Sequence, residues 1–229
     1  MHKQVPIKDA INLAVQVYRK AGNQYNKENV YEYKNTEDGP LEQITTKSNK
    51  QILKELFDKD QLVIDPKCND MVEDIYNHYQ GLVFKVLSDT ASDFVERIYK
   101  IVTKEMVERK DLGFVAPLPA LYEQEMARDL FIEEVSESQH LGTLGTKMNT
   151  RAILHEARYI RTRDFHVYTF ISSGNLISHF SQKGITEWGA IPKLREGNEY
   201  NITFKVKRHG HSKFYNCNDT LVNYLKISD

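Results

Sequence analysis

The residues best suited to bind a ligand lie in one short segment, from Lys205 to Tyr215. Four fixed cations and two aromatic rings fall close together there: Lys205, Lys207, Arg208, Lys213, Phe214 and Tyr215. Cations can contact the phosphates of a single nucleic-acid strand, while flat rings stack on its bases. Gly210 would allow the segment to turn tightly. We therefore predict a basic, aromatic loop over residues 209–215 that contacts single-stranded nucleic acid.

Further cations and rings extend this predicted site. Arg158, Arg161 and Arg163 carry positive charge along and just past a predicted strand, and Trp188 lies in a predicted loop. We expect the loop residues Trp188, Phe214 and Tyr215 to be the rings that stack on bases. Strand residues alternate between two faces, so the sequence leaves open which of the remaining rings point outward. These rings are Phe165, Tyr168, Phe170, Phe180 and Tyr224.

No pattern of metal ligands or catalytic residues accompanies these groups. His209 and His211 could join Cys217 around a metal, but a fourth ligand and the paired-cysteine spacing of zinc sites are missing. The zinc-protease, phosphate-loop and nucleophile-elbow motifs do not occur. We therefore predict a non-enzymatic protein without metal or cofactor. A metal-dependent nuclease, using acids such as Asp70 and Asp74, is the less favoured alternative.

The composition is that of a folded protein, and the net charge is unevenly divided. Hydrophobic residues make up 40% of the 229 residues, which is enough for packed cores. Residues 147–229 hold 13 Lys and Arg against 7 Asp and Glu, a net charge of +6, while the remainder carries −7. This asymmetry favours a polyanion as partner of the basic part. Chance composition of two domains would give the same division.

The cellular compartment is predicted from the absence of membrane, secretory and disulfide features in the sequence. No stretch approaches the roughly 18 apolar residues of a membrane helix, and the first residues lack the apolar region of a secretory signal. The two cysteines, Cys68 and Cys217, do not make a disulfide scaffold. We expect a cytoplasmic location, in the host cytoplasm if the protein is viral, and no contact with a membrane.

The first half has the periodicity of helices. Apolar residues recur at three- and four-residue spacing over residues 5–21, 69–87 and 94–106, and another helix is expected over 120–134. Ser48 followed by Gln51 resembles a capping box, and Thr90 with Asp93 offers a second helix start. The polar segment 34–47, which Gly39-Pro40 interrupts, is predicted to be a loop.

The second half has the pattern of strands. A polar, glycine-bearing stretch over 136–145 predicts a domain boundary. The predicted strands are Arg151–Arg161, Phe165–Ile171, Leu176–Ser181, Tyr200–Arg208 and Thr220–Ile227, with hairpin-turn residues between the second and third. Five strands match an oligonucleotide-binding (OB) barrel. The predicted fold class is α+β, with an acidic helical domain over residues 1–136 and a basic, five-stranded OB-like barrel over residues 137–229.

From Ser138 onward, several short motifs resemble the terminal OB barrel of DNA-binding replication proteins in tailed bacteriophages. They are Gly142-Thr143-Leu144-Gly145, an aromatic hairpin turning at Gly174-Asn175, the lead-in Leu194-Arg195-Glu196-Gly197, the strand end Val206-Lys207-Arg208-His209, and Thr220-Leu221. The resemblance covers about 40% of the chain. It implies binding of single-stranded DNA or attachment to replication machinery. The last residues lack the long acidic tail with which many single-strand binders recruit partners.

Together these features predict a single-stranded DNA-binding protein of phage-type replication, recombination or repair. The helical half would supply self-association or a surface for a replication or host protein. The alternative is a protein-interaction adaptor or inhibitor, because small barrels also bind peptides. The sequence leaves open DNA against RNA and the oligomeric state.

Overall fold

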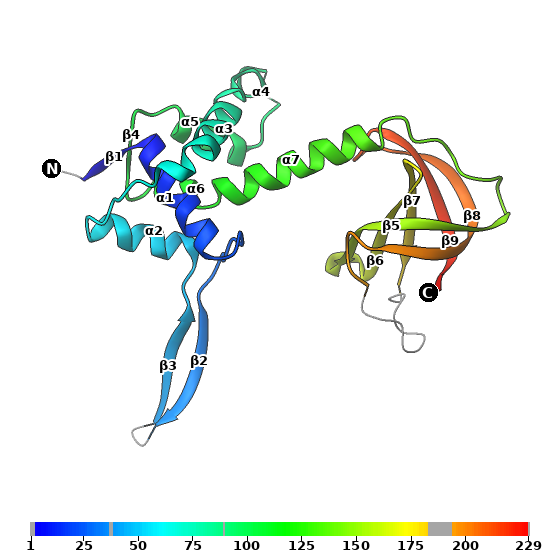
Figure 1. The fold of residues 1–229 in the computed structure, drawn as a ribbon, viewed down its shortest axis with the longest axis horizontal. Coiled ribbons are helices and arrows are strands. Elements are labelled where there is room, and N and C mark those ends of the chain that lie inside the picture. Colours follow the sequence, from blue (N-terminus) through cyan, green and yellow to red (C-terminus); the bar gives the residue numbers. More distant parts are fainter. Residues whose placement is uncertain (1–2, 37–38, 89, 183–193, 229) are drawn as a thin grey trace. The chain divides into compact units, whose positions relative to one another are not determined.

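The computed structural model describes residues 3–36, 39–88, 90–182 and 194–228. It has the predicted α+β layout, with helices between residues 7 and 134 followed by a closed five-stranded barrel (Figure 1). The chain divides into two compact units, which we call the helical unit (Met1–Met126) and the barrel unit (Ala127–Asp229). Within the described ranges, no helix is long and apolar enough to cross a membrane.

The helical unit is packed around its first helix. Its helices are α1 (Ile7–Lys20), α2 (Asn49–Asp58), the short turn η1 (Pro66–Cys68), α3 (Asn69–Gln80), α4 (Val83–Leu87), α5 (Asp93–Val102), α6 (Leu112–Val115) and the first turns of α7 (Leu118–Glu134). Ala10, Ile11 and Val15 of α1 are wholly buried, and α2, α3 and α6 pack against this helix. Most of the predicted apolar stripes therefore form one core, but Leu87, Phe94 and Met106 at their ends are exposed.

Two helix boundaries differ from the prediction, and one is confirmed. The Ser48 hydroxyl accepts the Gln51 N–H at 3.2 Å, as the capping box predicts. The start of α5 is capped by Ser92, which accepts the Val95 N–H at 3.4 Å, rather than by Thr90. The single helix predicted over 69–87 is broken into α3 and α4 around Gly81, because glycine is a poor helix former.

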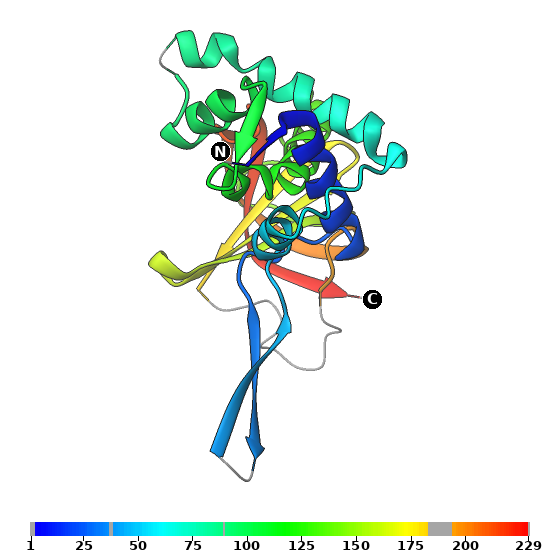
Figure 2. The ribbon, with the colours of Figure 1, turned by 90° about the vertical axis from the view of Figure 1, so that its left-hand side faces the viewer.

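The segment predicted to be a loop over 34–47 forms most of a β-hairpin, so that prediction was wrong. β2 (Val30–Thr36) and β3 (Gly39–Thr46) pair antiparallel, with Thr36 opposite Gly39. Both strands are rich in β-branched and aromatic residues, which favour strands over polar loops. Gly39-Pro40 begins the second strand instead of interrupting the structure. Figures 1 and 2 show the hairpin extending away from the helices of its unit.

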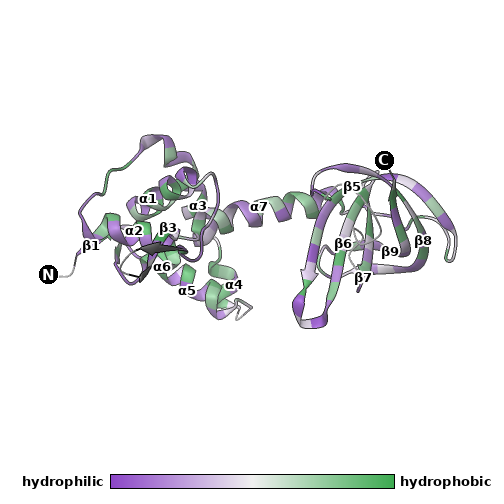
Figure 3. Cartoon of the chain, turned by 90° about the horizontal axis from the view of Figure 1, so that it is seen from below, coloured by the Kyte–Doolittle hydropathy of each residue, from purple (hydrophilic) through white to green (hydrophobic). Residues whose placement is uncertain are grey.

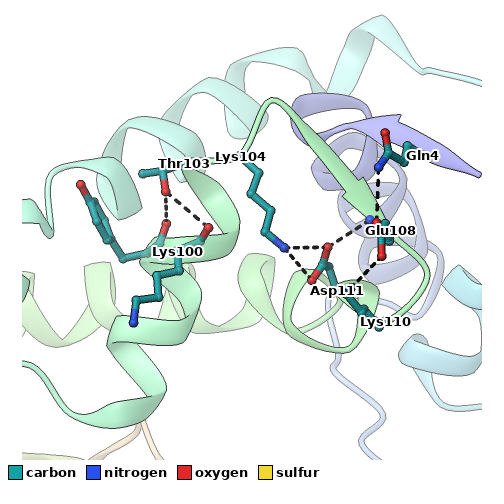
Figure 4. Close-up of polar contacts among 8 residues, drawn as sticks. Gln4, Lys100, Thr103, Lys104, Glu108, Lys110 and Asp111 are labelled. Atoms are coloured by element: carbon teal, nitrogen blue, oxygen red, sulfur yellow. Dashed lines mark hydrogen bonds and ion pairs between the residues drawn. The ribbon is translucent and has the colours of Figure 1, made fainter. Parts of the chain in front are cut away.

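A short strand pair and a buried acid complete the helical unit. β1 (Gln4–Pro6) pairs antiparallel with β4 (Met106–Glu108). Both carboxylate oxygens of Asp111 accept bonds from Lys104 Nζ at 3.0 Å, and one of them also accepts the Glu108 N–H at 3.0 Å (Figure 4). The Asp111 side chain is only 8% exposed. Burial of a carboxylate is tolerated when it is paired in this way, so Asp111 fixes the turn between β4 and α6.

The barrel has the topology expected of an OB-like fold. Its strands are β5 (Lys147–Ile160), β6 (Phe165–Ser172), β7 (Asn175–Ser181), β8 (Glu199–Ser212) and β9 (Cys217–Ser228), with the short turn η2 (Arg161–Arg163) after β5. They neighbour one another in the order β5-β6-β7-β9-β8, and β8 closes the barrel against β5. Only the β7–β9 pair is parallel within these strands. All five predicted strands are therefore confirmed.

Strand β8 is longer than predicted, and this changes the expected binding loop. His209, Gly210 and His211 pair with Thr220, Asp219 and Asn218 of β9, so they belong to the strand. The prediction of a loop over 209–215 was wrong for its first four residues. The turn follows at residues 213–216 and ends at Asn216, whose φ is 53°.

Alternation along the strands gives the barrel its interior. The largest wholly buried side chains are Leu154, Phe170, Ile177, Ile202 and Phe204. On β8, Ile202, Phe204 and Val206 are buried while Lys205 and Lys207 are exposed, as the sequence pattern predicts. Figure 3 shows this alternation of hydrophobic and hydrophilic residues along the barrel strands.

The polar stretch after Ser136 is attached to the barrel by hydrogen bonds. The Ser138 hydroxyl donates to the Asn218 carbonyl and accepts the Leu176 N–H, both at 2.8 Å. Farther along, the Leu141 N–H donates to the Thr220 hydroxyl at 2.9 Å. At Gly142, where φ is 63°, a β-carbon would lie 2.2 Å from the sulfur of Met148. The positive φ therefore favours glycine here, and a larger residue would also require the Met148 side chain to move.

Candidate nucleic-acid interface

The predicted cations lie at two different places on the outer surface of the barrel. We call the first the arginine face; it comprises Arg158, Arg161, Arg163, Phe165 and Phe180. We call the second the lysine strip; it comprises Lys147, Lys205, Lys207 and Lys226. β5 contributes to both, with Lys147 at its start and Arg158 near its end. Eleven residues of strand correspond to roughly 35 Å, so these two groups do not form one compact site.

The arginine face combines positive charge with one exposed ring and one half-buried ring. Arg158 is opposite Val167 on β6, and Val167 is opposite Phe180 on β7, so Arg158 and Phe180 share the outer face of three adjacent strands. The rings of Phe165 and Phe180 meet edge to face, with centroids 5.9 Å apart. Phe180 is 50% exposed. Two apolar rings held in this way on a surface offer area on which a base could stack.

The connection from β5 to β6 places two more arginines beside these rings. Arg161 and Arg163 are exposed in η2. The Tyr159 hydroxyl donates to the Asp164 carboxylate at 2.6 Å, which closes this connection, and Asp164 has a φ of 50°. That hydrogen bond is the main cause of a raised Tyr159 pKa. The hydrogen bond between Tyr159 and Asp164 therefore stabilises the connection that carries Arg161 and Arg163.

Rings also line the neighbouring inner side of β6 and β7. The rings of Tyr159 and His166 lie 4.9 Å apart, those of His166 and Tyr168 6.0 Å, and those of Tyr168 and His179 6.2 Å. His179 is buried and hydrogen-bonded through Nδ1 to the Val222 carbonyl at 3.0 Å. Burial lowers the pKa of His179. The row therefore runs from half-exposed rings to a buried histidine whose neutral form is favoured.

The lysine strip contains two residues that the sequence analysis did not select. Lys147 lies directly opposite Lys205 in the β5–β8 register, and Lys226 lies opposite Thr203 on the same outer face. All four lysines are exposed. Among the described residues, no carboxylate forms an ion pair with any of them. The alternation of β8 was visible in the sequence, but its pairing with the first and last strands was not.

The turn after β8 holds one exposed ring and one buried ring. Phe214 is 53% exposed, and the Arg128 guanidinium lies 4.5 Å from its centroid. Tyr215 is only 7% exposed and packs against Phe131 of α7, with centroids 4.8 Å apart. Burial raises the pKa of Tyr215 to about 12. The prediction that Tyr215 is an exposed base platform was therefore wrong, because its ring completes a small core.

That small core covers one end of the outer face of β6 and β7. Its buried members are Phe131, Val135, Ile171, Leu176, Tyr215 and Cys217. His155 stacks on Phe131 with centroids 3.4 Å apart. In OB barrels, ligands lie on the second and third strands and the connections after the first and fourth. Here the last turns of α7 cover the hairpin end of that surface, and the arginine face lies at its other end.

The remaining predicted residues have separate positions. Arg208 follows an irregularity between Val206 and Arg208 in the β8–β9 pairing, and both Arg208 and Lys213 are exposed. Arg208 and His140 contribute positive charge near Asp219, whose pKa burial nevertheless raises. Arg158 lies 3.5 Å from Glu156, an exposed pairing that contributes little to stability. Trp188 lies outside the described residues.

The searched part of the chain contains no group of three or more His, Cys, Asp or Glu residues that could hold a metal ion. Comparisons with protein-family models, curated proteins and solved structures find no match for this chain. The barrel expected from the resemblance to phage replication proteins is confirmed by the structure. The comparisons give no support to a phage origin or to a role in replication.

Proposed function

We propose that the barrel binds single-stranded DNA on the arginine face, as a non-catalytic binding protein acting in DNA replication, recombination or repair. The observation that carries this proposal is the presence of three exposed arginines on the same part of the barrel as the exposed Phe180 ring and the half-buried Phe165 ring. This surface coincides with the part of an OB barrel that usually holds ligands.

Each part of the face has a distinct role in the proposal. Arg158, Arg161 and Arg163 contact phosphates, and Phe180 stacks on a base with Phe165 supporting it edge-on. Stacking on an exposed ring contributes on the order of 1–3 kcal/mol per base. Contacts of this kind are nearly independent of base identity, so the proposed sequence preference is weak. The lysine strip contacts the phosphates of a longer strand. It carries positive charge but no ring pair, so we assign it no stacking on bases.

Fluorescence anisotropy with a labelled single strand of about 30 nucleotides tests the proposal, because a strand of that length covers several times a minimal OB site. The protein is titrated at several salt concentrations, with a matched duplex alongside. One variant is Arg158→Gln/Arg161→Gln/Arg163→Gln, and a second is Phe180→Ala. The control is Arg97→Gln/Lys100→Gln, which removes two exposed charges from α5 of the helical unit.

Salt-sensitive binding with a preference for the single strand would support the proposal. The arginine variant should then reduce the salt slope by about 2, since each phosphate contact on a single strand contributes about 0.7. Phe180→Ala should weaken binding with little change in slope. Absence of binding at low salt would refute the proposal and favour the protein-adaptor alternative, which a pull-down would then address. Cleavage of the strand with added Mn²⁺ would instead favour a nuclease.

A further inference from the structure

The helical unit contains an open cavity of about 450 Å³, and three of its six lining residues are cations. Its lining residues are Ser48, Lys50, Gln51, Lys54, Glu55 and Arg109. They come from the start of α2 and from the turn after β4. The cavity is open to solvent, so a ligand bound there would remain partly exposed. The helical unit as a whole is acidic, so a cluster of three cations around one cavity is unusual for it.

The carboxylates at this cavity already have partners. Glu55 accepts bonds from Lys47 Nζ at 2.8 and 2.6 Å and from the Gln51 amide at 3.0 Å. Asp58 accepts bonds from Arg109 Nε at 2.8 Å and Nη2 at 2.9 Å. Within the described ranges, neither Lys50 nor Lys54 forms an ion pair with a carboxylate. The lining cations and their partners therefore retain two positive charges.

The two unpaired lysines are held close to the other cations. Burial lowers the pKa of Lys54, and the nearby charges of Lys50 and Arg109 lower it further. The Lys50 side chain passes over Gly113 of α6, where a β-carbon would lie 3.3 Å from Lys50 Cε. The bonds of Arg109 to Asp58 use Nε and Nη2, which leaves the Nη1 edge of the guanidinium for another acceptor.

We propose that this cavity binds the phosphate group of a phosphate monoester. Such a group carries a charge of about −1.5 to −2 at neutral pH, which matches the two uncompensated positive charges, and its three oxygens are strong acceptors. Lys50 and Lys54 supply ammonium donors from one face of α2, and Arg109 supplies planar N–H donors from the turn after β4. A carboxylate would neutralise only half of the charge.

The monoester has two possible sources, a free phosphorylated small molecule or the terminal phosphate of a nucleic-acid strand. The recognition chemistry is the same for both. All lining residues belong to the helical unit, so the proposal does not depend on nucleic-acid binding by the barrel.

Isothermal titration of the full chain with phenyl phosphate, a simple monoester, is the first test, and sodium acetate is the comparison ligand. The test variant is Lys50→Gln/Lys54→Gln, because glutamine keeps the side-chain length and helix propensity similar. The matched control is Lys100→Gln, which removes an exposed lysine that already pairs with Glu96. To separate the sources, an oligonucleotide with a 5′-phosphate is compared with the same oligonucleotide ending in a 5′-hydroxyl.

Saturable binding of phenyl phosphate that weakens about tenfold or more in the double variant, but not in Lys100→Gln, is the expected result. A tighter complex with the 5′-phosphorylated strand, lost in the double variant, would identify a strand end as the source. Equal affinity for both strands would identify a free small molecule. The proposal is overturned if phenyl phosphate does not bind, binds the double variant equally, or binds no better than acetate.

Discussion

Replacement of Tyr215 by alanine should destabilise the barrel more than the same replacement of its neighbour Phe214. Both rings are adjacent in a basic segment, and the sequence predicts that both stack on bases. In the structure Tyr215 is 7% exposed and Phe214 is 53% exposed. The pair therefore distinguishes a ring that packs inside the barrel unit from one at its surface.

The magnitudes follow from the contacts of each ring. Truncation of a buried aromatic side chain to alanine usually costs about 3–5 kcal/mol. Tyr215 packs against the rings of Phe131 and His155, so we expect a loss of at least about 3 kcal/mol. Tyr215→Phe keeps the ring and should cost only about 1 kcal/mol. Phe214→Ala removes the contact with Arg128 and an edge-to-face contact with the Tyr215 ring, together worth about 1–2 kcal/mol.

Hydrogen exchange of peptides from β6 and β7 measures the barrel separately from the helical unit. In Tyr215→Ala, the free energy of opening measured for these peptides should be at least about 3 kcal/mol lower than in the unmodified protein. Exchange of peptides from the helical unit should not change. Thermal unfolding should show the barrel transition lowered by more than about 10 °C. Full retention of barrel protection in Tyr215→Ala, with loss of DNA affinity, would refute our assignment of this ring to a core.

Three further predictions concern caps, buried acids and pH. Ser48→Ala should lower the free energy of unfolding of the helical unit by about 1 kcal/mol, because it leaves the Gln51 N–H without its cap; urea unfolding followed by circular dichroism measures this. Asp111→Asn should cost about 2 kcal/mol in the same assay, since an amide cannot accept from Lys104 through both terminal atoms, and Asp93→Asn is the exposed control. Burial lowers the pKa of His179, so the unfolded chain takes up that proton at a higher pH than the folded barrel. Barrel stability should therefore fall as the pH drops below about 6.5, by up to about 1.4 kcal/mol per pH unit, and His179→Gln should flatten the profile. Stability that rises on acidification through this range, in the unmodified protein but not in the variant, would contradict the assignment.

The barrel was predictable because its strands carry local signals. Alternation on β8 identified Phe204 and Val206 as inward and Lys205 and Lys207 as outward. Hairpin-turn residues located the β6–β7 turn, where Ser173 and Gly174 both have positive φ. These features depend on neighbours within a few residues, so one sequence is sufficient to find them.

The composition of the candidate site was less predictable because it depends on strand pairing over long separations. Lys147 meets Lys205 only through the β5–β8 register, and Arg158 reaches Phe180 only through β6. The burial of Tyr215 depends on Phe131, and no local pattern in the sequence predicts that this helical residue packs against the barrel. The cavity in the helical unit was not predicted because Arg109 is more than 50 residues away in sequence from Lys50 and Lys54.

The strand order of the barrel also determines when it can fold during synthesis. β5, β6 and β7 form a meander that can pair as it leaves the ribosome, but both of its outer strands then have unpaired edges. β8 covers the edge of β5, and β9 is required to join β7 to β8. Until residues 217–228 have emerged, the nascent barrel therefore exposes a sheet edge able to pair with other chains. A truncation within β9 should consequently cause aggregation of newly made protein rather than a modest loss of stability.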